Sequence, residues 1–224
     1  MREGGGAGGY SRVEDLPDII PVFPLDGALL LPRGGLPLNI FEPRYLNMID
    51  DVMSGDRLLG MIQTRPGGDR ARPQLAPVGC VGRITTYSET ADGRYLITLT
   101  GVCRFMAGAE IAAATPYRQL RVDFAPFEDD LRPPPAEAAF GRDRMLAALK
   151  AYLHRRDLDI DWDTAGAAPA EALINSLAMA LPFAPNEKQA LLEAETLAER
   201  ETVLVALMEI EAAANDEEEP PPLQ

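Results

Sequence analysis

The first half of the chain consists of short apolar runs separated by prolines and glycines. From residue 19 onward these runs read IIPVFPL, ALLLP and LPLNIF. Proline has no backbone N–H, so it is tolerated at strand ends and on edge strands and is disfavoured inside helices. We therefore predict short strands with sharp corners, in a β domain that covers residues 17–127. The preceding residues 1–16 are rich in glycine and polar side chains and are predicted to be disordered.

One short helix and one hairpin are predicted within this β domain. The helix follows Pro43 and ends before Gly55, and its apolar residues have helical spacing: Tyr45, Leu46, Ile49, Val52 and Met53. The hairpin turns at Asp92 and Gly93, between two runs with strong β propensity. Between the helix and the hairpin, the stretch TRPGGDRARPQ is predicted to be a loop because of its Gly, Pro and Arg content.

In the second half the spacing of apolar residues changes to about 3.6, the period of an α-helix. The change follows FEDDLRPPPAE, whose acidic residues and prolines predict a linker over residues 128–135. A helical bundle is predicted for residues 136–213, and within it Thr196 and Glu199 have the spacing of a capping box. The acidic, proline-ended residues 214–224 are predicted to be a disordered tail. The predicted fold class is α+β.

The composition predicts a protein with a sizeable core and opposes binding to nucleic acid. Hydrophobic residues make up 46% of the 224 residues, and the formal net charge is −14. A charge of this sign repels phosphate backbones. The two cysteines, Cys80 and Cys103, lack CxxC spacing and predict a reducing compartment. Because no apolar run approaches the roughly 18 residues that span a bilayer, we expect a cytoplasmic protein without membrane contact.

The sequence contains no recognisable catalytic, cofactor or metal site. The single histidine, His154, stands beside two arginines with no nucleophile next to it. The glycine run GGGAGG has neither the strand nor the helix that flank a phosphate-binding loop. The aspartates of DLDIDWD lack the glycine and the glutamate of a calcium loop, so we interpret this stretch as an interhelical loop anchored by Ile160 and Trp162. We expect no enzyme, although a hydrolase built from dispersed carboxylates stays open.

The order of several motifs resembles the N-terminal domain of the Lon protease family. The motifs are FPL, LLLPRGGLPLNIFEPRY, GDRLLGMIQ, VGCVGRI and DGRYLITLTGVCRF in the β half, followed by EKQALLE and LAER in the helical half. The resemblance covers residues 17–213. It implies a PUA-like β pseudo-barrel with an inserted helix, followed by an α-helical bundle.

The resemblance also implies a function. In Lon proteases this region helps to select and hold protein substrates, while an AAA+ module hydrolyses ATP and a serine-lysine protease domain cleaves the substrate. This sequence contains neither of those modules, so we expect a stand-alone, non-enzymatic module that binds unfolded or extended protein segments or acts as an adaptor, with a protease or chaperone as a candidate partner. The alternative is an RNA-binding PUA-like protein with a local basic patch, formed by Arg65, Arg70, Arg72 and Arg83. The oligomeric state stays open.

The candidate peptide-binding or fold-signature residues lie in a few short stretches of the β half: Phe23, Pro24, Leu25, Pro37, Phe41, Glu42, Arg44 and Tyr45. Glu42 precedes Pro43, whose fixed φ suits a first helical turn, so PLNIFEPRY is predicted to be a strand-to-helix junction. Glu42 is expected to pair with an arginine such as Arg44. Phe41 and Tyr45 are expected to pack the helix against the barrel. Exposed apolar residues could instead join the two halves or form a homodimer.

Overall fold

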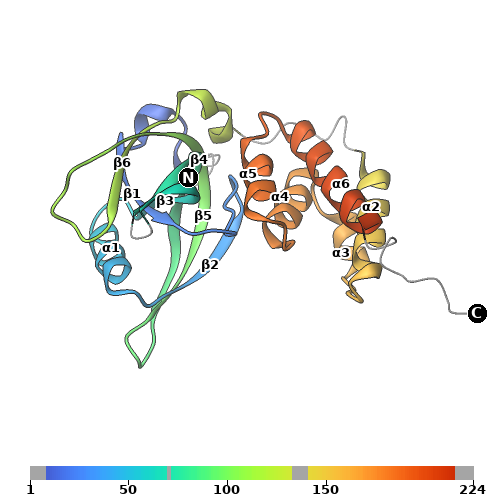
Figure 1. Ribbon diagram of the computed structural model, residues 1–224, viewed down its shortest axis with the longest axis horizontal. Coiled ribbons are helices and arrows are strands. Elements are labelled where there is room, and N and C mark those ends of the chain that lie inside the picture. The colour runs from blue at the N-terminus through green and yellow to red at the C-terminus, as the bar shows by residue number, and fades with distance from the viewer. Residues whose placement is uncertain (1–8, 70–71, 133–140, 215–224) are drawn as a thin grey trace, which may run out of the picture.

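The computed structural model describes residues 9–69, 72–132 and 141–214 (Figure 1). The strands gather in one half of the molecule, and the α-helices that follow them in sequence lie in the other half (Figure 1). The α+β fold class predicted from the sequence is therefore confirmed.

The described strands form one mixed sheet that closes on itself. They are β1 (Ile19–Pro24), β2 (Gly35–Ile40), β3 (Leu58–Asp69), β4 (Arg72–Glu89), β5 (Tyr95–Glu110) and β6 (Arg118–Asp123). Their order is β2-β5-β4-β3-β1-β6, and β6 also pairs with β5, so β5, β4, β3, β1 and β6 form a closed pseudo-barrel. β1 and β3 are parallel, while the other pairs are antiparallel. Within the described sheet, β2 alone keeps a free edge.

Helix α1 (Pro43–Met53) connects β2 to β3 and lies against the barrel (Figure 1). It begins at a proline after an extended residue, as the sequence predicts, and buries the face formed by Tyr45, Met48, Ile49 and Val52. Two tyrosines hold its C-terminal half. The Tyr95 hydroxyl donates to Asp50 over 2.9 Å, and the Tyr117 hydroxyl donates to Asp51 over 2.6 Å. The strand-to-helix junction is confirmed.

The helical half contains α2 (Arg142–Arg155), α3 (Trp162–Ala167), α4 (Ala170–Ala180), α5 (Pro185–Glu193) and α6 (Leu197–Ala214). The predicted capping box is present, because the Glu199 N–H donates to the Thr196 hydroxyl and the Thr196 N–H donates to the Glu199 carboxylate. In DLDIDWD, the Asp161 carboxylate caps α3, so Trp162 opens a helix that the sequence did not predict. No helix in the described ranges is long and apolar enough to cross a membrane.

A buried polar cluster joins the two halves. Arg104 of β5 contacts both carboxylate oxygens of Asp130, over 2.9 and 3.0 Å, and donates to the carbonyls of Leu192 and Ala194 at the end of α5. Nearby, the Asn175 amide of α4 donates to the Pro32 carbonyl over 3.2 Å. The larger core cluster is also continuous from the barrel into the helices. The helical half is therefore packed onto the barrel.

Three predicted unstructured segments are in part ordered. Residues 9–16 contain the 3-10 helix η2 (Val13–Asp15), and Leu16 is buried in the core. The predicted linker contributes to the 3-10 helix η3 (Ala125–Leu131), where Asp130 is buried because Arg104 pairs with it. Ala214, the first residue of the predicted tail, ends α6. The remaining predicted unstructured residues, 1–8, 133–135 and 215–224, lie outside the described residues.

The loop predicted for TRPGGDRARPQ is wrong. Its described residues, 64–69 and 72–74, form the end of β3 and the start of β4, where Thr64 pairs with Leu75 and Arg65 with Gln74. Register shifts beside these pairs accommodate the extra residues. Pairing between strands overrides the local turn signal that Gly and Pro give in sequence.

Cys80 and Cys103 are buried, free thiols on neighbouring strands. Val81 is the register partner of Cys103, so these two share a face of the sheet and Cys80 points to the opposite face. Each cysteine belongs to a different core cluster. Burial raises the pKa of both thiols, which keeps them protonated and suits a packing role.

Candidate functional site

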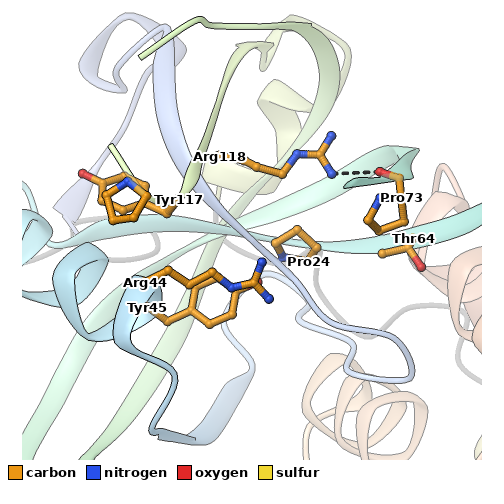
Figure 2. Close-up of a pocket in the computed structure, with 8 residues that line it drawn as sticks. Pro24, Arg44, Tyr45, Thr64, Pro73, Tyr117 and Arg118 are labelled. Carbon is orange, nitrogen blue, oxygen red and sulfur yellow. Dashed lines mark hydrogen bonds between the residues drawn. The ribbon is translucent and has the colours of Figure 1, made fainter. Parts of the chain in front are cut away.

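A shallow groove crosses the barrel beside the start of β6. It consists of three adjoining hollows of about 220, 160 and 350 Å³. The first and middle hollows share Tyr117, and the middle and last hollows share Arg118. We call this surface the Tyr117 groove. Its middle hollow, drawn in Figure 2, is lined by Pro24, Arg44, Tyr45, Thr64, Pro73, Pro116, Tyr117 and Arg118.

The outer hollows differ in chemistry. The first hollow lies between the start of β1 and the end of α1, and its lining includes Ile19, Asp51 and Asp56. The last hollow lies over β4 and the β5–β6 ladder, and its lining includes Arg65 and Leu75. The first hollow thus has two carboxylates and one guanidinium group, from Arg57, while the last has two guanidinium groups and one carboxylate, from Glu110; both are partly apolar.

Elements far apart in sequence build the middle hollow. The parallel pairing of β1 with β3 brings Pro24 beside Thr64. The first turn of α1 supplies Arg44 and Tyr45. Arg118 comes from the first residue of β6, which pairs with β1. Residues that line the hollow come from β1, α1, β3, β4 and β6, so the hollow exists only when the barrel is closed.

Contacts behind the groove fix its tyrosines. The Tyr45 ring is buried against Phe23, with the ring centres 4.2 Å apart. Burial, together with the hydrogen bond to Asp51, raises the pKa of Tyr117 to about 12. Tyr117 therefore stays neutral and keeps this bond near pH 7. These walls are ordered before a ligand arrives, which lowers the entropy cost of binding.

Arg118 is held in place by three hydrogen bonds. It donates to both carboxylate oxygens of Glu110, over 3.0 and 2.9 Å, and to the Pro73 carbonyl over 2.8 Å (Figure 2). Arg72 reaches the same carboxylate over 2.6 Å. Burial alone would raise the pKa of Glu110. The hydrogen bonds from Arg118 and Arg72 outweigh this effect and lower the pKa, so Glu110 stays ionised.

The structure brings three of the eight candidate residues, Pro24, Arg44 and Tyr45, into the middle hollow. Phe23 lies beneath this hollow through its contact with Tyr45. Glu42 forms the expected ion pair with Arg44, over 2.8 Å. Five of the eight candidates therefore lie in the middle hollow or contact a residue that lines it.

The other three candidates lie away from the hollow. Leu25 follows β1 at the surface, and Pro37 is exposed on β2. Phe41 was expected to pack α1 against the barrel, and this expectation is wrong: the side chain is 62% exposed and lies beside the Arg94 guanidinium. Tyr45 alone makes the predicted contact, because it lies on the buried face of α1 and Phe41 precedes the helix.

Five residues that line the middle hollow were absent from the sequence-based candidates: Thr64, Pro73, Pro116, Tyr117 and Arg118. Thr64 and Pro73 fall in the stretch predicted to be a loop. Tyr117 and Arg118 open a predicted strand, and no local pattern marks such a position as part of a groove. Their proximity arises from strand pairing between distant residues, which a single sequence does not reveal.

The predicted basic patch is partly neutralised. Arg72 pairs with Glu110, and Arg65 donates to the Leu75 carbonyl over 3.1 Å. Arg83 lies on β4, while Arg70 is outside the described residues. The arrangement gives little support to an extended phosphate-binding surface.

The groove suits contact with side chains better than it suits a cofactor. Each hollow lies below or near the lower end of the roughly 300–1,000 Å³ typical of small-molecule sites. Among the described residues, no group of three or more His, Cys, Asp or Glu side chains is placed to hold a metal ion. The geometry can offer hydrogen bonds, guanidinium groups and small apolar surfaces to a chain that lies along it.

Comparison with known families identifies the fold. The family model of the ATP-dependent protease La (LON) substrate-binding domain matches residues 19–209, which is most of the chain. The chain belongs to this family. The resemblance inferred from the sequence motifs is therefore confirmed for the Lon N-terminal domain.

Lon proteases are similar to this chain over part of their length. Lon protease 2 of Sorangium cellulosum is 27% identical over 217 residues, which cover 88% of this chain and 26% of that protein. Lon protease 2 of Myxococcus xanthus is 28% identical over 117 residues, which cover 51% of this chain and 14% of that protein. The chain thus spans about a quarter or less of these Lon proteases.

Two solved structures show the same fold. The Lon N-terminal domain protein from Xanthomonas campestris has a TM-score of 0.58 and 23% sequence identity, covering 84% of this chain and 97% of that chain. The N-terminal domain of Mycobacterium avium complex Lon protease also has a TM-score of 0.58, with 20% identity, covering 85% of this chain and 97% of that chain. The Lon N-terminal fold therefore includes both the barrel and the helical half.

Proposed function

We propose that the chain is a non-enzymatic protein-binding module whose Tyr117 groove holds extended segments of other proteins. The observation that carries this proposal is the row of three hollows joined through Tyr117 and Arg118. In an extended chain, alternate side chains point the same way and are about 6.6–6.8 Å apart. A row of small hollows can therefore receive successive side chains of one strand-like segment.

The polarity of the groove supports loose rather than strict selection. Ile19 and Leu75 offer apolar contacts in the outer hollows, and the Tyr117 hydroxyl already donates its hydrogen bond to Asp51. Unfolded proteins expose apolar side chains in extended conformations, so they are the proposed clients. Segments held here would be passed to a protease or chaperone in an adaptor role, consistent with the family's name.

Strand addition is the weaker mode of capture. β2 has the free edge in the described sheet, but it is six residues long and contains Pro37, which has no N–H to donate. Short edges and prolines are devices that discourage pairing with another chain. We therefore assign binding to the groove.

A hollow on the helical half is less suited to extended segments. It lies between α2 and α3, has a volume of about 640 Å³, and is lined by residues that include His154, Leu158 and Trp162. It is a single wide depression, and it shares no lining residue with the three hollows of the Tyr117 groove. His154 is exposed there, as expected for a solvated helical histidine.

Replacing Ile19 by aspartate is expected to weaken client binding about tenfold, since it places a carboxylate beside Asp51 and Asp56 and removes apolar contact from the first hollow. Binding of fluorescent, reduced and carboxymethylated α-lactalbumin is measured by anisotropy, with the native protein as a folded competitor. Leu96→Asp is the matched control, because Leu96 is 46% exposed and Ile19 is 37% exposed, both on strands.

The proposal fails if the chain shows no preference for the unfolded client over the folded competitor. It also fails if the two aspartate variants, at equal thermal stability, bind the client as tightly as the unmodified protein. Equal weakening by both variants would place the binding surface elsewhere.

A further inference from the structure

We propose that the middle hollow of the Tyr117 groove recognises a carboxylate side chain of the bound segment. This inference rests on the proposed function and adds the chemical class of the client. Among the described residues that line the hollow, Arg44 and Arg118 carry charge and no carboxylate is present. Figure 2 shows their guanidinium groups on either side of Pro24.

The two arginines have different contacts. Arg118 is fixed by Glu110 and the Pro73 carbonyl, and its side chain is mostly buried. Arg44 forms an ion pair with Glu42, in which both side chains are about half exposed, and it stacks over the Tyr45 ring at 4.5 Å. Exposed ion pairs are weak, so Arg44 can exchange Glu42 for a carboxylate that arrives from a ligand.

The backbone of α1 also favours a carboxylate in the middle hollow. Arg44 and Tyr45 belong to the first turn of this 11-residue helix, and no side chain caps its N-terminus. The helix dipole places partial positive charge at this end. A carboxylate in the middle hollow would meet this partial charge and the two guanidinium groups together.

The charges in the two outer hollows decide which side chain of the bound segment enters the middle hollow. The first hollow contains Asp51 and Asp56 beside Arg57, and it disfavours a second carboxylate. The last hollow contains Arg65 and Arg118 with Glu110. The protein has a formal net charge of −14, but the middle hollow is lined by positive charge and favours an acidic side chain. Its volume of about 160 Å³ is of the size of one side chain.

The test uses three fluorescent nonapeptides of alternating leucine and serine, with glutamate, glutamine or lysine at the centre. We expect the glutamate peptide to bind about fivefold tighter than the glutamine peptide, as one exposed charge pair would give, and the lysine peptide to bind weakest. Arg44→Gln should abolish this ranking, because the remaining guanidinium group, that of Arg118, is already paired with Glu110. Arg94→Gln is the matched control, because Arg94 forms a similarly exposed ion pair with Asp92 on the β4–β5 hairpin.

Equal affinity for the three peptides would overturn this inference and leave the proposed function intact, since binding would persist without charge selection. A ranking that survives in Arg44→Gln would also overturn it. Loss of the ranking in Arg94→Gln would show a general charge effect and would count against the hollow. If no peptide binds and the unfolded client does not bind either, the proposed function and this inference fail together.

Discussion

Replacing Arg104 by alanine is expected to lower the free energy of unfolding by about 3–5 kcal/mol. Arg104 is 5% exposed, and its guanidinium group contacts both oxygens of Asp130 and the carbonyls of Leu192 and Ala194. It also lies over the Phe127 ring at 4.6 Å. Removal leaves a buried carboxylate and buried carbonyls without their donor, which costs more than the pair contributes by itself.

Urea unfolding followed by circular dichroism measures this loss. Arg94→Ala is the control, because its ion pair with Asp92 is exposed and should contribute at most about 1 kcal/mol. The double variant Arg104→Ala with Asp130→Ala should recover part of the stability, since it removes the unpaired carboxylate as well. A loss below about 1 kcal/mol for Arg104→Ala would contradict the role of this cluster in joining the two halves.

Replacing Gly101 by alanine is expected to destabilise the protein by about 3 kcal/mol, at the upper end of the range for overpacking. A Cβ atom at this position would lie 2.0 Å from the Leu31 carbonyl oxygen and 2.7 Å from its carbon. The backbone has little room to move away, because the Gly101 N–H donates to Gly34 over 2.9 Å and the Gly101 carbonyl accepts from Arg33 over 2.8 Å.

Gly35 provides the control for this substitution. It lies on β2 opposite Thr100, next to Gly101, and a Cβ there would meet no atom within 4 Å. Gly35→Ala should therefore change the free energy of unfolding by no more than about 1 kcal/mol. Equal thermal midpoints for the two variants in calorimetry would contradict the close packing of residues 31–34 against β5.

Local patterns in the sequence located many of the elements. Pro43 marks the start of α1, Asp92 and Gly93 turn the hairpin between β4 and β5, and Thr196 with Glu199 caps α6. Each of these signals acts within a few residues, so a single sequence contains it in full. The order of the motifs predicted the fold, because it identified a family in which the contacts between distant residues are shared.

Contacts between distant residues were beyond such patterns. Asp130 lay in a predicted linker because its neighbours are acidic and proline-rich, whereas Arg104, 26 positions away, buries it. Phe41 looked like a core residue by its type alone, but no element covers enough of its ring to bury it. Five of the eight residues that line the middle hollow were missed for the same reason, since Thr64 and Arg118 approach Pro24 through strand pairing.

Site-specific photo-crosslinking tests the proposed role of the groove most directly. The photoreactive residue p-benzoylphenylalanine replaces Pro116, which is exposed and lines the middle hollow, and in separate proteins it replaces Leu96 or Ile210, which are exposed elsewhere. The proteins are irradiated with reduced, carboxymethylated α-lactalbumin, and the products are mapped by mass spectrometry. We expect client crosslinks from position 116 and none above background from positions 96 and 210. Crosslinks from position 210 or 96 without any from position 116 would contradict binding in the Tyr117 groove.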